Sequence, residues 1–290
     1  MIRKMMFPTD FSLAAEKIFN CIPSFKVLGM KEALLVHVVD ERYDAAVLER
    51  AKLAQYELEK YKDQFKDEGI KVKVIVKTGV PSVEINKLAE KEKVSLVVLT
   101  SHGKSMIEKM LLGSVTEKVI FNCTRPVLLE RVAVFENYKQ KTCSELICKN
   151  TFKHVLFPTD WSECANDVLK SVRKFKKFGT KEITVMHVMD ERNLKYHTKE
   201  KIAEFKKIDQ DKLDKVAKDL KKRGFKVNTL LTKGSPFKEI KRAARKSEIT
   251  LITMGVHGKG FVKEILLGST TERVAKFAFK PVLLLSHNEY

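Results

Sequence analysis

The sequence predicts an α/β protein built from two copies of one parallel-sheet domain. The 290 residues have the length of about two domains. Short apolar runs alternate along the chain with longer amphipathic stretches, which is typical of parallel strands joined by crossover helices. The chain also repeats itself with a period near 150 residues. Solenoid repeats have periods of roughly 20–50 residues, so this period indicates a domain duplication.

The repeat consists of motifs that occur twice in the same order. Phe7-Pro8-Thr9-Asp10 recurs as Phe157-Pro158-Thr159-Asp160, at an offset of 150 residues. Further on, Leu111-Leu112-Gly113-Ser114 recurs as Leu266-Leu267-Gly268-Ser269, at an offset of 155. Five extra residues therefore lie in the second copy, between positions 192 and 224.

The first copy shows the expected order of elements. Strands are expected over residues 4–8, 33–39, 71–77, 95–100 and 126–131, and helices over about 12–28, 45–68, 81–92 and 114–122. Ser12 stands at the N-cap of the first helix, Gly69 ends the second in a left-handed conformation, and Pro81 lies in the first turn of the third. The second copy repeats these signals at Ser162, Gly224 and Pro236.

The strands and motifs divide the chain into domains. Residues 1–131 form the first expected domain, residues 132–152 a linker, and residues 153–290 the second expected domain. The linker contains the polar stretch 137–142, which shows no strong periodicity.

Composition excludes several classes of protein. A content of 44% hydrophobic and 32% charged residues is that of a soluble globular chain. No apolar run approaches the ~18 residues of a membrane span, and Pro8 interrupts the N-terminal stretch before a signal-peptide core forms. We therefore expect a cytoplasmic protein with no membrane partner. The five cysteines are too few and too scattered for a disulfide scaffold, and only Cys143 and Cys148 are close together.

Positive charge is concentrated in the second half of the chain. Residues 1–150 hold 25 Lys and Arg against 20 Asp and Glu, whereas residues 151–290 hold 31 against 17. A basic surface raises the alternative of a polyanion partner. Many of these lysines lie in mixed-sign stretches, which favours solvated helix faces. No basic stripe is interleaved with aromatic residues, so nucleic acid is disfavoured as a partner.

Polar and glycine residues follow the predicted strands, where open parallel sheets bind their ligands. Asp10 and Asp160 follow the first strand of each copy. After the fourth strand, the second copy reads G-x2-G-x9-G-S, with its first glycine at Gly255 and its last at Gly268. Such glycines allow backbone N–H groups to approach an anion and allow positive φ. The helix that begins after Gly268 offers an N-terminus that favours phosphate.

These motifs, found twice and in order, resemble the universal stress protein family in its tandem, two-domain form. The resemblance covers nearly the whole chain and rests on the Phe-Pro-Thr-Asp starts, the His-Val-x-Asp ends of the second strands, the glycine pattern and the closing Pro-Val-Leu-Leu strands. It implies a doubly wound five-stranded parallel sheet of order 3-2-1-4-5 in each domain, with helices on both faces. It also implies domain pairing through the fifth strands, and it leaves open whether two chains form a homodimer.

The resemblance further implies the branch of the family that binds ATP, because the glycine pattern separates the ATP binders from other members. Asp160 would lie near the ribose or a phosphate-bound Mg²⁺ ion, with Asp10 its counterpart, and the Val188 backbone would contact adenine. The residues implied around the nucleotide in the second copy are Pro158, Thr159, Asp160, Val188, Gly255, Val256, His257, Gly258, Lys259, Gly268, Ser269, Thr270 and Thr271. Those implied in the first copy are Pro8, Thr9, Asp10, Val38, Thr100, His102, Gly103, Lys104, Gly113, Ser114, Val115 and Thr116.

One position departs from the family pattern. Thr100 stands where the first copy should have its first glycine. A β-branched side chain resists positive φ, although a Thr is tolerated if the backbone there is ordinary β. We therefore expect the second site to bind ATP more tightly than the first.

The histidines and lysines of the motifs have two interpretations each. His37 and His187 lie in apolar strands, which favours core residues over a general base. His102 and His257 are expected to shape the glycine loop or contact phosphate. Lys104 follows the second glycine of the motif and is either a mobile charge for phosphates or a solvent-facing lysine, and Lys259 repeats it.

The leading function is an ATP-binding regulatory protein of a stress response, with ATP, ADP and AMP not distinguished. The first alternative is a weak Mg-dependent ATPase or nucleotidyl-transfer enzyme, which needs a positioned nucleophilic water. No Ser–His–Asp or paired-carboxylate arrangement points to catalysis, so no catalytic residue is assigned. The second alternative is an interaction protein that binds a polyanion through the basic second half, with an affinity that falls steeply with salt.

Overall fold

The protein was analysed as a computed structural model, which describes residues 2–42, 46–100, 112–131, 150–246, 248–256 and 267–285. The chain divides into two compact units, residues 1–150 and residues 151–290. Most of the expected linker, residues 132–149, lies outside the described part, as do Cys143 and Cys148.

The first unit is a five-stranded parallel sheet with the strand order β3-β2-β1-β4-β5. Its strands are β1 (Lys4–Pro8), β2 (Glu32–Val39), β3 (Lys71–Thr78), β4 (Leu96–Thr100) and β5 (Val127–Glu130). Its described helices are α1 (Leu13–Asn20), α2 (Val47–Gln64), α3 (Pro81–Lys91) and α4 (Ser114–Asn122). Two 3₁₀ segments, η1 (Ile22–Leu28) and η2 (Lys66–Glu68), extend α1 and α2.

The second unit repeats this topology with the order β8-β7-β6-β9-β10. Its strands are β6 (His154–Thr159), β7 (Glu182–Asp190), β8 (Lys226–Gly234), β9 (Leu251–Gly255) and β10 (Val282–Leu285). Its described helices are α6 (Glu163–Val172), α7 (Glu191–Leu194), α8 (Lys199–Lys222), α9 (Pro236–Ala244) and α10 (Ser269–Phe277), and η3 (Phe175–Phe178) follows α6. The predicted fold, two copies of a sheet of order 3-2-1-4-5, is confirmed.

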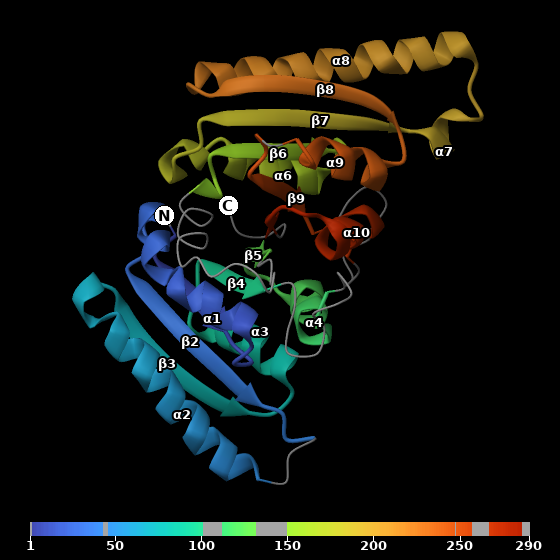
Figure 1. Cartoon of the computed structure of the whole chain (residues 1–290). Helices are drawn as coiled ribbons and strands as arrows, with labels where there is room; N and C mark the ends of the chain where they lie inside the picture. Colours follow the sequence, from blue (N-terminus) through green and yellow to red (C-terminus); the bar gives the residue numbers. More distant parts are fainter. Residues whose placement is uncertain are drawn as a thin grey trace. The chain divides into compact units, whose positions relative to one another are not determined.

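The strand order places helices on both faces of each sheet. The chain moves outward from β1 to β3 and then crosses to β4 on the other side of β1. Because each crossover between parallel strands is right-handed, the reversal puts the later helices on the opposite face from the earlier ones. In agreement, α3 packs beside α4 and α9 beside α10 (Figure 1).

The core of each unit is made by its central strands, which are buried on both faces. Met5, Met6 and Phe7 of β1 are fully buried, and Leu34 and Leu35 of β2 are too. The edge strand β3 shows no buried residue at all in its pattern. Continuous apolar runs in central strands and mixed runs at the edge are what a sheet covered by helices on both faces requires.

The local signals in the sequence are confirmed. Ser12 Oγ accepts the Ala15 N–H at 3.3 Å, and Ser162 Oγ accepts the Ala165 N–H at 3.2 Å. Pro81 and Pro236 begin α3 and α9. Gly69 and Gly224 end the helical segments before β3 and β8 with φ of 64° and 85°.

One predicted helix is shorter than expected. The α-helix expected over residues 12–28 ends at Asn20 and continues as the 3₁₀ segment η1. Pro23 lies within the first two positions of η1, and a proline has no N–H to continue an α-helical ladder. The second unit has Arg173 at the matching position and also changes from α6 to the 3₁₀ segment η3, so the change of helix type does not require the proline.

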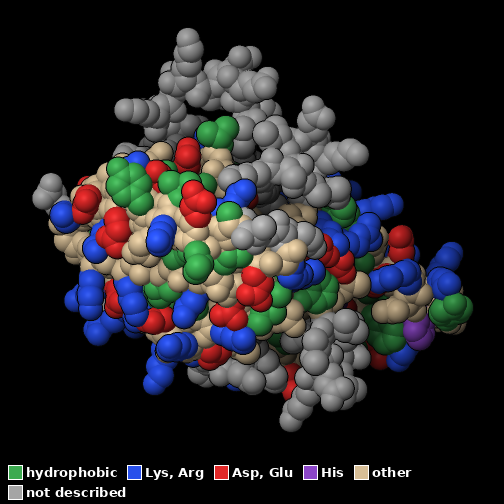
Figure 2. Space-filling view, turned by 90° about the horizontal axis from the view of Figure 1, so that it is seen from below, with side chains coloured by type: hydrophobic (Ala, Val, Ile, Leu, Met, Phe, Trp, Pro, Cys, Tyr) green, Lys and Arg blue, Asp and Glu red, His purple; other side chains and the backbone are tan. Residues whose placement is uncertain are grey.

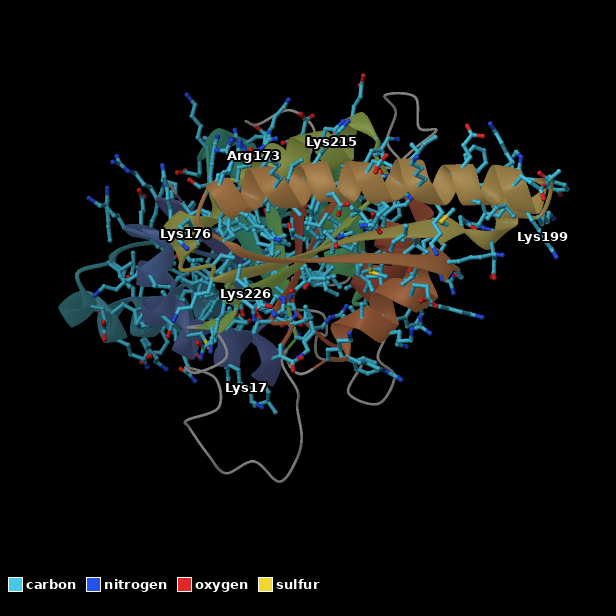
Figure 3. The ribbon with its side chains drawn as sticks, turned by 90° about the horizontal axis from the view of Figure 1, so that it is seen from above. Lys17, Arg173, Lys176, Lys199, Lys215 and Lys226 are labelled. Carbon is cyan, nitrogen blue, oxygen red and sulfur yellow. The ribbon has the colours of Figure 1, made fainter. Side chains whose placement is uncertain are left out.

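In the part of the chain that the structure describes, no helix combines the length and the apolar character that a membrane span requires. The exposed long helix α8 is charged along its length, with Lys199 at its beginning and Lys215 further along (Figure 3).

Replacing Gly69 tests the left-handed turn before β3. No atom lies within 4 Å of the position that a Cβ would take there, so the cost of Gly69→Ala is that of the backbone conformation alone. We expect a loss of about 1 kcal/mol in the free energy of unfolding, measured by urea denaturation. Gly69→Asn should lose less, because Asn tolerates this conformation better. Equal losses in the two variants would contradict this explanation.

Candidate nucleotide site

A cavity of about 490 Å³ opens at the carboxyl edge of the second sheet. It lies where the strand order reverses, between the ends of β7, β6 and β9, which is where open α/β sheets bind their ligands. Its walls come from these strands and from α7, α8, α9 and α10. The residues that line it include Pro158, Thr159, Asp160, His187, Val188, Asp190, Arg192, Leu194, His197, Phe205, Asp209, Gly255, Gly268, Ser269, Thr270 and Thr271.

The start of α10 forms one side of this cavity. Gly268 is the N-cap and offers no side-chain cap, whereas Ser162 caps α6 with its hydroxyl. The Gly268 N–H donates to the Val256 carbonyl at 3.0 Å, and Thr271 Oγ1 donates to the Gly255 carbonyl at 3.0 Å. These two bonds fix the helix start to the end of β9. The backbone N–H groups of the first residues of α10, from Ser269 on, have no partner within the helix and are suited to an anion.

The first unit builds the same start at α4. Gly113 is the N-cap and again gives no side-chain cap, and Thr116 Oγ1 donates to the Thr100 carbonyl at 3.1 Å. In both copies the threonine of this helix start therefore bonds to the strand. The hydroxyl side chains left at the helix start are those of Ser269 and Thr270 in the second unit, and that of Ser114 in the first, where Val115 follows.

Of the two backbone conformations that the sequence left open at the motif glycines, the described ones do not use positive φ. Gly113 has φ of −62° and Gly268 has φ of −57°, and Gly255 ends strand β9 without a positive φ. Their contribution is the missing side chain, which allows close approach of a ligand to the backbone. Thr100 accordingly occupies an ordinary β position at the end of β4, so it differs from Gly255 in side-chain volume and not in backbone strain.

The loop after the first strand holds the aspartate of the Phe-Pro-Thr-Asp motif. Asp160 Oδ1 accepts from the Ser162 N–H at 3.0 Å and from the Ser162 hydroxyl at 2.6 Å. Trp161 has a φ of 64°, rare for a bulky residue, and its N–H donates to Thr159 Oγ1 at 3.2 Å. Hydrogen bonds to its own side chains thus hold the loop in one conformation. The loop in turn fixes the Asp160 carboxylate at the cavity wall.

Asp10 is held in the same way in the first unit. Its Oδ1 accepts the Ser12 N–H at 3.0 Å, and Phe11 takes the place of Trp161 with a φ of 57°. Val38 is buried at the end of β2, while its counterpart Val188 is half-buried and lines the cavity. Val256 is buried, and its backbone bonds to Leu285 and Gly268.

A histidine, an aspartate and a tryptophan form a linked group beside the cavity. His187 Nδ1 donates to the Thr159 carbonyl at 2.7 Å, and its Nε2 faces Asp209 Oδ2 at 3.4 Å. The Trp161 ring stacks on the imidazole with centroids 5.0 Å apart. The Trp161 Nε1–H donates to Asp209 Oδ1 at 3.0 Å. Asp209 therefore joins α8 to the loop after β6.

The first unit lacks this linkage. His37 Nδ1 still donates to the Thr9 carbonyl at 2.8 Å, and the Phe11 ring lies 4.7 Å from the imidazole. The helix residue at the offset of 155 from Asp209 is Ala54, which is buried. This alignment is supported by Leu58 and Leu213, which are both fully buried. An indole N–H and its acceptor are thus both absent from the first unit.

A second aspartate marks the end of β7. Asp190 caps α7 by accepting the Arg192 backbone N–H at 3.0 Å. The Arg192 guanidinium donates to the same carboxylate, with an Nη2 to Oδ2 distance of 2.6 Å. These hydrogen bonds hold the pKa of Asp190 below its usual value. The carboxylate is therefore ionised at neutral pH and keeps Arg192 at the cavity wall. Asp40 and Arg42 repeat the pair in the first unit.

The remaining residues of the predicted site lie outside the described part of the chain. They are His102, Gly103, Lys104, His257, Gly258 and Lys259. Within the described ranges, no group of three or more His, Cys, Asp or Glu side chains is placed to hold a metal ion. The described cysteines, Cys21, Cys123 and Cys164, are buried and not in disulfides.

Comparison with known proteins identifies the family. The model of the universal stress protein family matches residues 1–131 and again residues 151–286. The chain belongs to the universal stress protein family. It is 37% identical over 153 residues to universal stress protein MJ0577 of Methanocaldococcus jannaschii, an alignment that covers 44% of this chain and 94% of the relative.

A solved universal stress protein matches the chain as a whole. The crystal structure of a universal stress protein from Archaeoglobus fulgidus superposes with a TM-score of 0.72 at 25% identity, and the match covers 99% of this chain and 100% of that one. A second universal stress protein of M. jannaschii, MJ0531, is 34% identical over 142 residues, which are 47% of this chain and 84% of the relative. The two family matches and the full-length match to the A. fulgidus structure support a tandem two-domain architecture for this chain.

Sequence reasoning missed the wall that α7 and α8 supply. Leu194, His197, Phe205 and Asp209 line the cavity, but no motif marks them, because they lie in or near the stretch where the two copies lose their alignment. The available signal was the joint change of Phe11 to Trp161 and of Ala54 to Asp209 between the copies. A new N–H donor and a new acceptor that appear together indicate a contact.

The two copies also supply a test of the Trp161–Asp209 bond. We expect Asp209→Ala to lower the free energy of unfolding by about 1–3 kcal/mol, because a partly buried indole N–H loses its acceptor. The double variant Trp161→Phe with Asp209→Ala reproduces the first unit's pair and should lose less than the sum of the single variants. Urea denaturation, monitored by circular dichroism, measures the free energy of unfolding of each variant in this double-mutant cycle. Additive losses would show that the two side chains act independently.

Proposed function

We propose that this protein is an adenine-nucleotide-binding regulatory module of a stress response, with its principal site in the second unit. The observation that carries the proposal is the cavity of about 490 Å³ that ends at the uncapped start of α10. A phosphate would be favoured there, because the helix dipole and backbone N–H groups that have no partner within the helix favour negative charge. The same cavity has apolar walls, Met186, Met254 and Ile240 among them, as a nucleoside requires.

The proposed pose follows the family resemblance. Phosphates would lie against Ser269 and Thr270 and the glycine loop, and the base would contact the backbone at Val188. Asp160, which is anchored by Ser162, would face the ribose. If a Mg²⁺ ion accompanies the phosphates, Asp160 would be the carboxylate that contributes an oxygen ligand to it.

The alternative of a polyanion-binding surface is less well supported. On the face shown in Figure 2, Lys and Arg side chains are interspersed with Asp and Glu. Several lysines of the second unit are also engaged in ion pairs, such as Lys226 with Glu182 at 3.1 Å and Lys201 with Glu204 at 2.8 Å. Mixed charge gives a weak and readily screened field for a polyanion.

Denaturing the purified protein and identifying the released small molecules by mass spectrometry tests the proposed function. We expect about one adenine nucleotide per chain, from the second site. If none is released, calorimetric titration with ATP decides, and the absence of binding there would overturn the proposal. Equal occupancy of two sites would contradict the expected preference for the second.

Exchanging Gly255 and Thr100 tests that preference. Gly255→Thr gives the second unit the side chain of the first. The added volume should weaken ATP binding on the order of tenfold, because overpacking a tight contact costs about 1–3 kcal/mol. Thr100→Gly should strengthen the first site. Calorimetry with ATP measures both, and Gly255→Ala serves as the control with the smallest added volume. An unchanged affinity in Gly255→Thr would mean that the position does not approach the ligand.

Asp160→Asn separates a regulatory module from a weak ATPase. The amide keeps the size of the carboxylate and removes its charge. We expect ATP to bind still, with any slow ATP hydrolysis by the unaltered protein unchanged. Hydrolysis that is lost in Asp160→Asn while binding remains would favour the enzyme instead.

A further inference from the structure

The second unit has nine residues, 193–201, where the first has four, 43–46. The boundaries follow from structural equivalences on each side. Arg192 and Arg42 make the same ion pair with the aspartate that ends the strand, at an offset of 150. Leu213 and Leu58 are the same fully buried helix position at an offset of 155. The five additional residues therefore lie between the strand end and the second long helix.

The longer segment forms the end of α7, the turn after it and the first residues of α8. Asp190 caps α7, and Thr198 caps α8 by accepting the Lys201 N–H at 3.3 Å. This cap starts α8 earlier than α2, whose first helical residue is Val47 and whose N-cap makes no side-chain bond. Hydrogen-bonded caps at Asp190, just before the segment, and at Thr198, within it, thus fix its path.

The segment forms a wall of the cavity. Asn193, Leu194 and His197 line the cavity together with Phe205 of α8. Leu194 is buried beneath the surface. The His197 and Phe205 rings meet edge to face, with centroids 5.1 Å apart and planes at 89°. Lys201 Nζ lies 5.3 Å from the Phe205 ring centroid. Apolar and aromatic groups therefore gather on this side of the cavity.

This wall lies across the cavity from the anion-binding helix start. α7 follows β7, and α10 follows β9, with β6 between the two strands. Figure 1 shows α7 beyond the carboxyl end of β7. Two strand spacings separate β7 from β9 by about 10 Å, which suits a ligand with an anionic group at one end and a flat ring at the other. At the position of Phe205, the first unit has Arg50, which offers no such ring.

We propose that the five-residue insertion makes a base-recognition wall in the second site, and that His197 and Phe205 determine its affinity for a purine base. A purine presents flat apolar faces that stack on aromatic side chains. The inference rests on the proposed nucleotide binding and adds the residues that select the base. It also gives the second site a reason for tighter binding that is independent of Gly255.

Calorimetry with two ligands tests the inference. ATP carries a base and phosphates, and inorganic tripolyphosphate carries phosphates alone. We expect His197→Ala and Phe205→Ala each to weaken ATP binding about tenfold and to leave tripolyphosphate binding unchanged. Tyr196→Ala is the matched control, because Tyr196 is an aromatic residue of the same segment that is 78% exposed and does not line the cavity. The Tyr196→Ala variant should bind ATP and tripolyphosphate with the same affinities as the unaltered chain.

The outcomes separate this inference from the proposed function. If the unaltered chain binds ATP and both variants bind it equally well, the insertion does not recognise the base, while nucleotide binding stands. An equal loss for ATP and tripolyphosphate would also overturn the inference, because the wall would then act on the phosphates or on folding. If the unaltered chain binds neither ligand, the proposed function itself fails. Circular dichroism of each variant confirms that it is folded.

Discussion

In each unit, a hydrogen bond from a histidine of the second strand to the end of the central strand fixes the loop at the carboxyl edge of the sheet. His187 Nδ1 donates to the Thr159 carbonyl, and His37 Nδ1 donates to the Thr9 carbonyl. A carbonyl can only accept, so the bond fixes the proton on Nδ1. The bond holds the start of the loop that follows the central strand. In this loop an aspartate comes first, and the residue after it has a positive φ. The histidines thus have a structural role, and the ring of each contacts the aromatic residue in the turn, stacked for His187 and Trp161 and tilted for His37 and Phe11.

The two units share this framework and differ on one side of it. Trp161, Asp209 and the inserted segment all lie on the side of β7 and α8, where the second unit adds polar and aromatic groups. The helix starts at Gly113 and Gly268 are alike in both units. The two copies therefore share the glycine helix starts and differ on the side of β7 and α8. Such a division lets one fold supply two sites of different affinity or selectivity.

Much of the fold followed from local chemistry. The N-caps at Ser12 and Ser162 and the left-handed Gly69 and Gly224 act within a few residues of their own position, so their sequence context was sufficient. The glycine pattern left the backbone conformation of the motif open, because it shows that a Cβ is absent but not whether positive φ or close approach requires this; the described motif glycines have no positive φ. The first helix of each unit continues as a 3₁₀ segment, a change of helix type that the apolar periodicity of residues 12–28 does not show.

The sequence by itself determined the duplication, the α/β class, the strands and the edge at which polar residues gather, because apolar periodicity and repeated motifs are written along the chain. Only the tertiary structure decided that Asp209 meets Trp161 from 48 residues away and that His197 and Phe205 complete a cavity wall. These contacts depend on where a helix lies over a sheet. The packing of α8 against β7 and β8 sets that position through side chains far apart in sequence, which no local pattern encodes.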